Sequence, residues 1–149
     1  MKRPEFKIIK VKDLKRAIEH IFENYEEILL AYLYGSYAKG NQTEFSDIDI
    51  GIVIKNDFKV SPLYFAEVSS KIEKEFNYKI NIDLRILNNA TPRFLFQVIN
   101  NSILLFVNNR RFKHEFELKV LSMYQEIKPM LDMYDKIYVT EVLKDENRS

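Results

Sequence analysis

Residues 28–54 have the sequence ILLAYLYGSYAKGNQTEFSDIDIGIVI, and this stretch decides the fold. Its first seven residues are apolar and end at Gly35, and a run of that length predicts a buried strand. Residues 47–54 then place isoleucine at every second position, which is typical of a strand with one buried face. The segment therefore predicts two strands joined by a glycine-containing connection.

Asp47 and Asp49 lie two residues apart in the second of these strands. Side chains two apart in a strand point to the same side, so both carboxylates should oppose the isoleucine face. Like charges this close repel each other unless a cation lies between them, and hard divalent cations prefer such oxygen ligands. The alternative is a solvent-facing polar face of an edge strand, and the pair alone leaves both interpretations open.

All three glycines of the chain, Gly35, Gly40 and Gly51, fall in this same stretch. Glycine is needed where φ is positive or where backbone approaches another group closely. Gly35-Ser36 directly follows a strand, and such a turn can present N–H groups and a hydroxyl to phosphate oxygens. A strand-to-helix turn with a serine cap is the alternative. We expect Gly51 to leave space beside the aspartate pair.

Asp83 occupies the centre of a second alternating segment, residues 80–86, on the side opposite its apolar residues. If this strand neighbours residues 47–54, three carboxylates meet over one sheet face, an arrangement that suits two metal ions roughly 3.5–4 Å apart. On its own Asp83 is an ordinary solvent-facing residue. Arg85 shares its face, and we favour pairing with a carboxylate over contact with a phosphate.

The remaining pattern predicts an α/β fold with one mixed sheet flanked by helices. We expect a helix over residues 13–25 with Asp13 as N-cap, and helices opened by Ser61-Pro62 and by Thr91-Pro92. Residues 103–107 predict a strand. A helical pattern starts near residue 110, Pro129 should break or kink it, and a last piece should end near residue 143. We expect residues 1–149 to form a single domain.

Composition excludes several classes of protein. The chain lacks cysteine, which rules out disulfides and thiolate chemistry. With 23 basic and 22 acidic residues it lacks the basic excess of proteins that bind long nucleic acids, so we expect no direct nucleic-acid binding. We find no signal peptide and no apolar run of membrane-spanning length, and therefore expect a cytoplasmic protein without membrane contact.

Together, Gly35-Ser36-Tyr37-Ala38-Lys39-Gly40, then Ser46-Asp47-Ile48-Asp49, then Asp83 resemble the signature of the polymerase β-like nucleotidyltransferase superfamily. The fuller pattern looks like its minimal nucleotidyltransferase (MNT) subgroup. The resemblance covers residues 28–107, with residues 110–143 as a C-terminal helical segment. Lys39 stands where the subgroup usually has arginine, which keeps the charge but loses bidentate phosphate geometry.

This resemblance implies a polymerase β palm-like fold and a role for each motif residue. Gly35 and Ser36, with Lys39 beside them, would bind the phosphates of ATP. Asp47 and Asp49 would bind Mg²⁺. Asp83 would complete a second metal site and help to activate the attacking hydroxyl.

The subgroup is known mainly as the antitoxin of HEPN/MNT toxin–antitoxin pairs. The resemblance therefore implies transfer of AMP from ATP to a tyrosine of a HEPN ribonuclease toxin, within a hetero-oligomeric complex of the two proteins. The alternatives are a small-molecule or RNA acceptor, and a non-catalytic antitoxin that neutralises its partner by binding. We expect the C-terminal aromatic residues mostly to pack in the core, with a docking surface as the alternative: Phe112, Phe116, Tyr124, Tyr134 and Tyr138.

Overall fold

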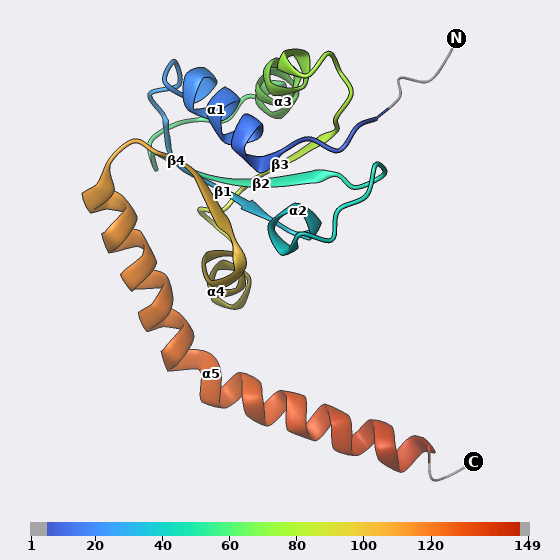
Figure 1. The fold of residues 1–149 in the computed structure, drawn as a ribbon. Coiled ribbons are helices and arrows are strands. Elements are labelled where there is room, and N and C mark those ends of the chain that lie inside the picture. The colour runs from blue at the N-terminus through green and yellow to red at the C-terminus, as the bar shows by residue number, and fades with distance from the viewer. Residues whose placement is uncertain (1–5, 147–149) are drawn as a thin grey trace.

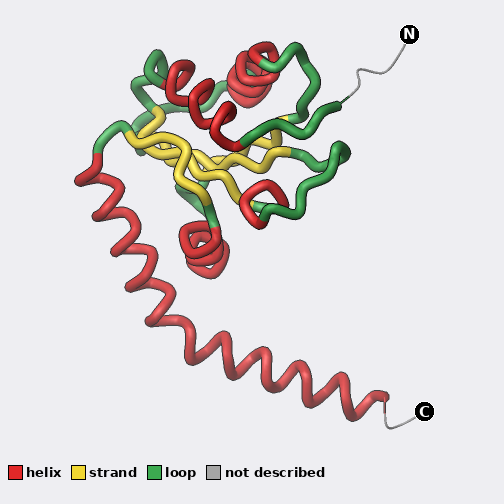
Figure 2. Tube along the Cα trace, in the orientation of Figure 1, coloured by secondary structure: helices red, strands yellow, loops and turns green. Residues whose placement is uncertain are grey.

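The structure is a computed structural model that describes residues 6–146. Over this range the chain forms a four-stranded sheet and five helices (Figures 1 and 2). No helix in these residues is long and apolar enough to cross a membrane. The elements, in chain order, are α1 (Val11–Phe22), β1 (Ile28–Tyr34), α2 (Ser36–Lys39), β2 (Ile48–Ile54), α3 (Tyr64–Glu75), β3 (Ile82–Ile86), α4 (Pro92–Asn101), β4 (Ile103–Val107) and α5 (Arg110–Glu146).

The sheet has the order β3-β2-β1-β4 and is mixed, as the sequence predicts. β1 runs antiparallel to β2 and to β4, while β2 and β3 are parallel. Parallel neighbours need a crossover connection, and α3 supplies it. The pairing of β2 with β3 sets Asp49 directly opposite Asp83, so the predicted adjacency of the two carboxylate-bearing strands is confirmed.

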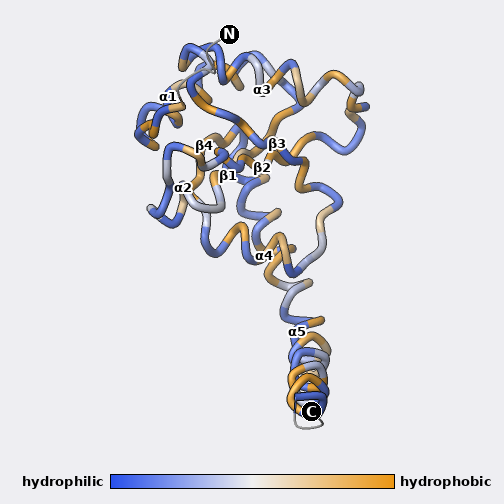
Figure 3. Tube along the Cα trace, turned by 90° about the vertical axis from the view of Figure 1, so that its right-hand side faces the viewer, coloured by the Kyte–Doolittle hydropathy of each residue, from blue (hydrophilic) through white to orange (hydrophobic). Residues whose placement is uncertain are grey.

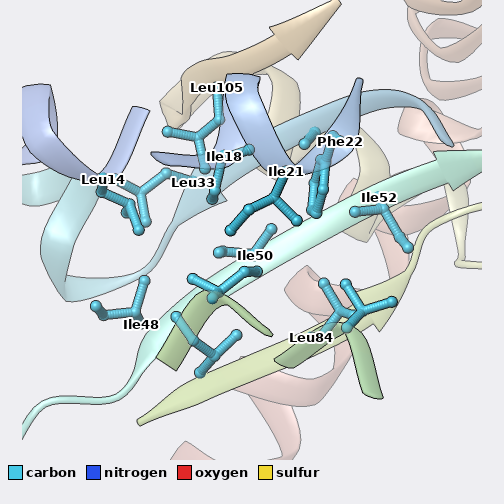
Figure 4. Close-up of a cluster of buried hydrophobic side chains, with 14 of the residues drawn as sticks. Leu14, Ile18, Ile21, Phe22, Leu33, Ile48, Ile50, Ile52, Leu84 and Leu105 are labelled. Atoms are coloured by element: carbon cyan, nitrogen blue, oxygen red, sulfur yellow. The ribbon is translucent and has the colours of Figure 1, made fainter. Parts of the chain in front are cut away.

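The isoleucine face of the sheet is covered by α1 and α3, which lie together on one side of it (Figure 1). Apolar side chains from both helices and all four strands fill this layer without a buried charge, and Figure 4 shows a part of it. Ile50 at the centre of β2 is fully buried. The strict alternation of β2 explains the arrangement, because one period-two face can be wholly apolar.

The opposite face is covered only in part. α4 and the first half of α5 pack there against Leu30, Val53 and Leu87, and Val120 is the buried residue of α5. Tyr32 lies in this layer, and its hydroxyl donates a hydrogen bond of 2.9 Å to Glu117. The end of this face that carries the aspartates is left accessible to a substrate, since Asp47 is exposed and Asp49 and Asp83 are only half-buried.

Of the three helix caps predicted from the sequence, one is confirmed, and α5 begins at Arg110 as predicted. The Thr91 hydroxyl accepts a 3.2 Å hydrogen bond from the backbone N–H of Phe94, which confirms the cap of α4. Asp13 is not the cap of α1, because the helix begins two residues earlier and Asp13 falls in its first turn. α3 begins at Tyr64, so Ser61 lies in the preceding turn rather than at the cap.

α5 is a single helix of 37 residues that contains Pro129, so the predicted separate last piece is wrong. The helix bends midway along its length (Figure 1). A proline inside a helix lacks the N–H for one hydrogen bond and crowds the preceding turn, and sharp bends are usually found at such positions. We therefore attribute the bend to Pro129, and the kink that the sequence offered as the other possibility is the better description.

Candidate active site

Gly35 joins β1 to the single-turn helix α2, so the strand-to-helix turn considered from the sequence is present, with Gly35 rather than Ser36 at the cap position. The φ of Gly35, +73°, lies in the region that favours glycine, and Gly40 ends α2 with φ of +76°. A Cβ atom at position 35 would overlap the carboxylate oxygen Oδ2 of Asp49. Gly35 is thus required both for its backbone conformation and for its close contact with Asp49.

Asp49 and Asp83 face each other across the parallel strands β2 and β3. The pKa of Asp49 is raised to about 6, mainly by burial and then by the adjacent Asp83 carboxylate, through its charge and a hydrogen bond. Arg85 opposes the shift and Asp47 adds a smaller like-charge effect. The pair therefore holds negative charge that its surroundings neutralise only in part.

Asp47 stands apart from this pair. It lies just before β2, is exposed, and its Oδ1 accepts a 2.8 Å hydrogen bond from the side-chain amide of Asn81. Among residues 6–146, no group of three His, Cys, Asp or Glu side chains is placed to hold a metal ion. The sequence predicted three converging carboxylates, and the structure brings two together. The third lies at the strand end, where Asn81 is its partner.

Arg85 forms a 3.4 Å ion pair with Asp83, the partner type that we favoured from the sequence. Both side chains are well exposed, so the pair adds little stability and can open for a substrate. Gly51 differs from our expectation. A Cβ atom there would meet the Leu87 side chain at 2.8 Å, so the room beside the strand is filled by leucine rather than left beside the aspartates.

Ser36 and Lys39 are the first and last residues of α2. Ser36 is half-buried next to Gly35, whereas Lys39 is exposed. The loop from α2 to β2 is closed on itself, because the Thr43 N–H donates to Ser46 Oγ at 2.9 Å and the Ser46 N–H donates to the Thr43 carbonyl at 3.0 Å. This loop connects the Gly-Ser turn to Asp47 and limits how far the two can separate.

Tyr34 is a site residue that the sequence did not single out. It pairs with Asp49 across β1 and β2, and its ring packs edge-on against Phe94 with centroids 5.7 Å apart. Its hydroxyl is buried without a hydrogen-bond partner. The pKa of Tyr34 is raised to about 12, mainly by burial; Arg85 opposes the rise, and the charges of Asp49 and Asp83 contribute to it. Its position directly before Gly35 was the available signal.

The donor set suits a divalent metal ion. Asp49 and Asp83 present adjacent carboxylate oxygens on a half-open surface, and carboxylates with phosphate oxygens are the usual ligands of Mg²⁺. The raised pKa of Asp49 reports like charge that a cation would neutralise. Asp49 and Asp83, with Asp47 at the strand end, are therefore the residues that would hold such an ion.

Comparisons with known proteins agree with this geometry. Residues 16–111 match the family described as polymerase beta nucleotidyltransferase. The protein adenylyltransferase MntA of Shewanella oneidensis is 27% identical over 112 residues, which cover 75% of this chain and 77% of MntA. A Methanocaldococcus jannaschii relative, whose name proposes the same activity, is 31% identical over 72 residues, covering 48% of this chain and 72% of the relative.

Solved structures show the same fold. A chain of a toxin–antitoxin crystal structure with AMP-PNP superposes with a TM-score of 0.66 at 25% identity, covering 83% of this chain and 98% of that one. A chain of the tri-AMPylated Shewanella oneidensis HEPN toxin in complex with its MNT antitoxin gives 0.62 at 22% identity, covering 85% and 98%. The family match spans every candidate site residue from Gly35 to Asp83, and the chain therefore belongs to the polymerase β nucleotidyltransferase family.

Proposed function

We propose that this nucleotidyltransferase is an antitoxin that transfers AMP from ATP to a tyrosine of a HEPN toxin. The observation that carries the proposal is the contact of Gly35 with the Asp49 carboxylate, beside Asp83. Through that contact, a turn of the kind that binds phosphate lies beside two carboxylates that can bind a cation. The name of the Shewanella oneidensis relative, a protein adenylyltransferase, supports the reaction type.

The reaction assigns a task to each residue. Gly35 and Ser36, at the start of α2, bind the outer phosphates of ATP, and Lys39 neutralises phosphate charge from the other end of that helix. The tyrosine oxygen of the toxin attacks the α-phosphorus. The new oxygen–phosphorus bond forms as the bond to the bridging oxygen breaks, and pyrophosphate leaves. Asp83 accepts the hydroxyl proton. Orientation and charge compensation supply most of the rate in such transfers.

Asp47, Asp49 and Asp83 would hold two Mg²⁺ ions in this proposal. When bound, the ions neutralise charge on the triphosphate and on the departing pyrophosphate. Asp49 is the ligand nearest the Gly-Ser turn, because Gly35 packs on its carboxylate. Asp47 would contribute to the ligand set from the end of β2, where its carboxylate accepts a hydrogen bond from Asn81.

The openness of the site supports a protein acceptor. The Asp83 side chain is 38% exposed, and Asp47 lies at the surface at the end of its strand. A tyrosine on the surface of a partner can therefore approach the carboxylates. In the solved complex from Shewanella oneidensis the HEPN toxin is tri-AMPylated, which supports a HEPN protein as the acceptor here.

Intact mass spectrometry tests the proposal. The chain is mixed with ATP, Mg²⁺ and the HEPN protein encoded beside it, and the partner is weighed before and after incubation. We expect the partner to gain one or more AMP groups. The double variant Asp47→Asn/Asp49→Asn should abolish the gain, and Asp57→Asn, which changes an exposed aspartate in the turn after β2, should preserve it.

Two other outcomes would replace the proposal. If the toxin is neutralised without any gain in mass, the chain acts as a binding antitoxin. If the label from ATP appears on an added RNA or small molecule instead, the enzyme class holds and the acceptor is different.

A further inference from the structure

The second half of α5 exposes many large apolar side chains to solvent. We call residues 130–146, which follow Pro129, the distal limb. The limb extends away from the sheet and ends far from it (Figures 1 and 3). Single exposed apolar residues are common, but a concentrated set marks an interaction surface. Its exposed large apolar side chains are Met130, Met133, Tyr134, Ile137, Tyr138, Val139, Val142 and Leu143.

The first half of the same helix packs against the domain on one side, and Leu118 and Leu121 are exposed on the other. Phe112 and Phe116 lie against the core beneath β1, and Tyr124 stacks on Phe96 of α4 with ring centroids 3.9 Å apart. Beyond Pro129 such contacts end, and Tyr134 and Tyr138 are 65% and 69% exposed. The C-terminal aromatics thus divide into a core group and a surface group, so the docking surface considered from the sequence is restricted to the limb.

The limb presents a stripe along one side. Met130, Tyr134, Ile137, Tyr138 and Val142 follow the three- and four-residue spacing that places side chains on one helical face. Seventeen helical residues span about 25 Å, a length that suits a helix laid in a partner's groove. Methionine and tyrosine are favoured at such surfaces because they pack adaptably and keep a polar end.

A chain of contacts connects the limb to the active site. Asp135 of the limb forms a 3.5 Å ion pair with Arg93 in the first turn of α4. The next residue, Phe94, packs edge-on against Tyr34, and Tyr34 pairs with Asp49. A protein bound to the stripe near Asp135 would therefore lie close to α4, whose Phe94 packs on Tyr34 next to Asp49.

The charge of the distal limb indicates which kind of partner surface it would bind. It contains five acidic and two basic residues, whereas the rest of the chain contains 17 acidic and 21 basic residues. Complementary charge across an interface guides association and selects partners. The matching surface is therefore an apolar groove or helix face flanked by lysine or arginine.

We propose that the distal limb is the docking surface for the protein that accepts the nucleotide, and that it holds the acceptor hydroxyl next to Asp49 and Asp83. This inference rests on the proposed function. The occupant is the acceptor protein, with an apolar face and a basic rim, rather than a second copy of this chain.

The test compares two sides of one helix. Tyr134→Glu/Ile137→Glu places charge on the stripe, and Val139→Glu makes the same kind of change two residues on, where the side chain points away from Ile137. All three positions are exposed, so the variants should fold, and circular dichroism checks this. The affinity for the purified HEPN protein encoded beside the chain is measured by calorimetry, and ATP binding is measured on the chain alone.

We expect the stripe variant to bind the partner at least about tenfold more weakly, with ATP binding unchanged, and Val139→Glu to bind nearly as the wild type does. Equal affinity of the stripe variant and the wild type, or an equal loss in both variants, would overturn the inference. So would a wild-type chain that dimerises alone through the stripe, or one that does not bind the partner. Binding through the stripe without AMP transfer would leave the docking surface intact and refute the proposed reaction.

Discussion

The two faces of the sheet differ in what the same strands contribute to them. Toward α1 and α3, β2 presents only isoleucine, and the layer is closed and apolar (Figure 4). Toward α4, the alternate positions of the same strand present Asp49, Gly51 and Val53. Asp49 there faces Asp83. Its carboxylate also lies so close to Gly35 that no larger residue fits at position 35. One strand thus supplies packing on one side and chemistry on the other.

The difference shows where stability is gained and where it is given up. Burial of apolar surface stabilises the closed face, whereas the open face keeps like charges together and a tyrosine hydroxyl unpaired. Substitutions should therefore have opposite signs on the two faces: truncation on the closed face destabilises, and neutralisation on the open face stabilises while activity is lost.

The largest effect is expected on the closed face. Ile50→Ala should lower the free energy of unfolding by about 4 kcal/mol, because it leaves a cavity at a fully buried position. Ile8→Ala, the same change at an exposed position, should change it by less than about 0.5 kcal/mol. Urea unfolding of both variants measures the difference, and a small loss at Ile50 would mean that the closed layer can repack.

Gly35→Ala comes next, with an expected loss of about 2 kcal/mol from strained backbone and the clash with Asp49. Gly40→Ala is the matched control: its φ is also positive, but no atom lies within 4 Å of the added Cβ, so the loss should be about 1 kcal/mol. Thermal unfolding compares the two. Equal losses would show that Asp49 moves aside freely, and the steric link between turn and carboxylate would be refuted.

Asp49→Asn should raise stability while it removes activity. With a folded pKa of about 6 against an ordinary value of 3.8, the ionised Asp49 carboxylate destabilises the metal-free fold at neutral pH. In the presence of a chelator we expect the variant to be more stable by about 1 kcal/mol at pH 7.5, after allowance for solvent screening. The advantage should shrink as pH falls through 6 and vanish below about 4. A gain that does not depend on pH would contradict this cause.

The smallest effect concerns two tyrosines of β1. Tyr34→Phe should stabilise by about 0.5 kcal/mol, because it removes a buried hydroxyl without a partner. Tyr32→Phe should destabilise by about 1 kcal/mol, because it removes the hydrogen bond to Glu117. Opposite signs from the same substitution would confirm the difference between paired and unpaired hydroxyls, and a loss at Tyr34 would refute it.

The strands β2 and β3 were predictable because their alternation is strict, whereas β1 was predictable from the length of its apolar run. The isoleucines of residues 47–54 assign one face to the core, and the same rule sets Asp49 and Asp83 on the other. Thr91-Pro92 was equally informative, since a cap and a proline are local signals. Ser61-Pro62 shows the limit of such signals, because the same pair there forms a turn ahead of α3.

The rest depended on contacts that a sequence does not display. α2 has four residues, too few for a helical period. Asp47 lies two residues before Asp49, so alternation assigns both to the same face of the sheet. Asp47 nevertheless precedes β2, and its carboxylate accepts a hydrogen bond from Asn81. Gly51 was expected to leave space beside the aspartates, but that space is filled by Leu87, which comes from a segment 36 positions later. The alternation of side chains also does not show which tyrosine hydroxyl of β1 forms a hydrogen bond.

The contact between Gly35 and Asp49 has a consequence for how this chain can change over time. A loop separates Gly35 from Asp49 in the sequence, but neither residue can change independently of the other. A larger residue at position 35 displaces the Asp49 carboxylate, and a displaced carboxylate leaves a cavity next to the turn. Related sequences should therefore keep or lose both together. A chain that has lost the aspartate is released from the steric need for glycine but keeps the need for positive φ, so the constraint on position 35 would be weaker in a descendant that has given up the reaction.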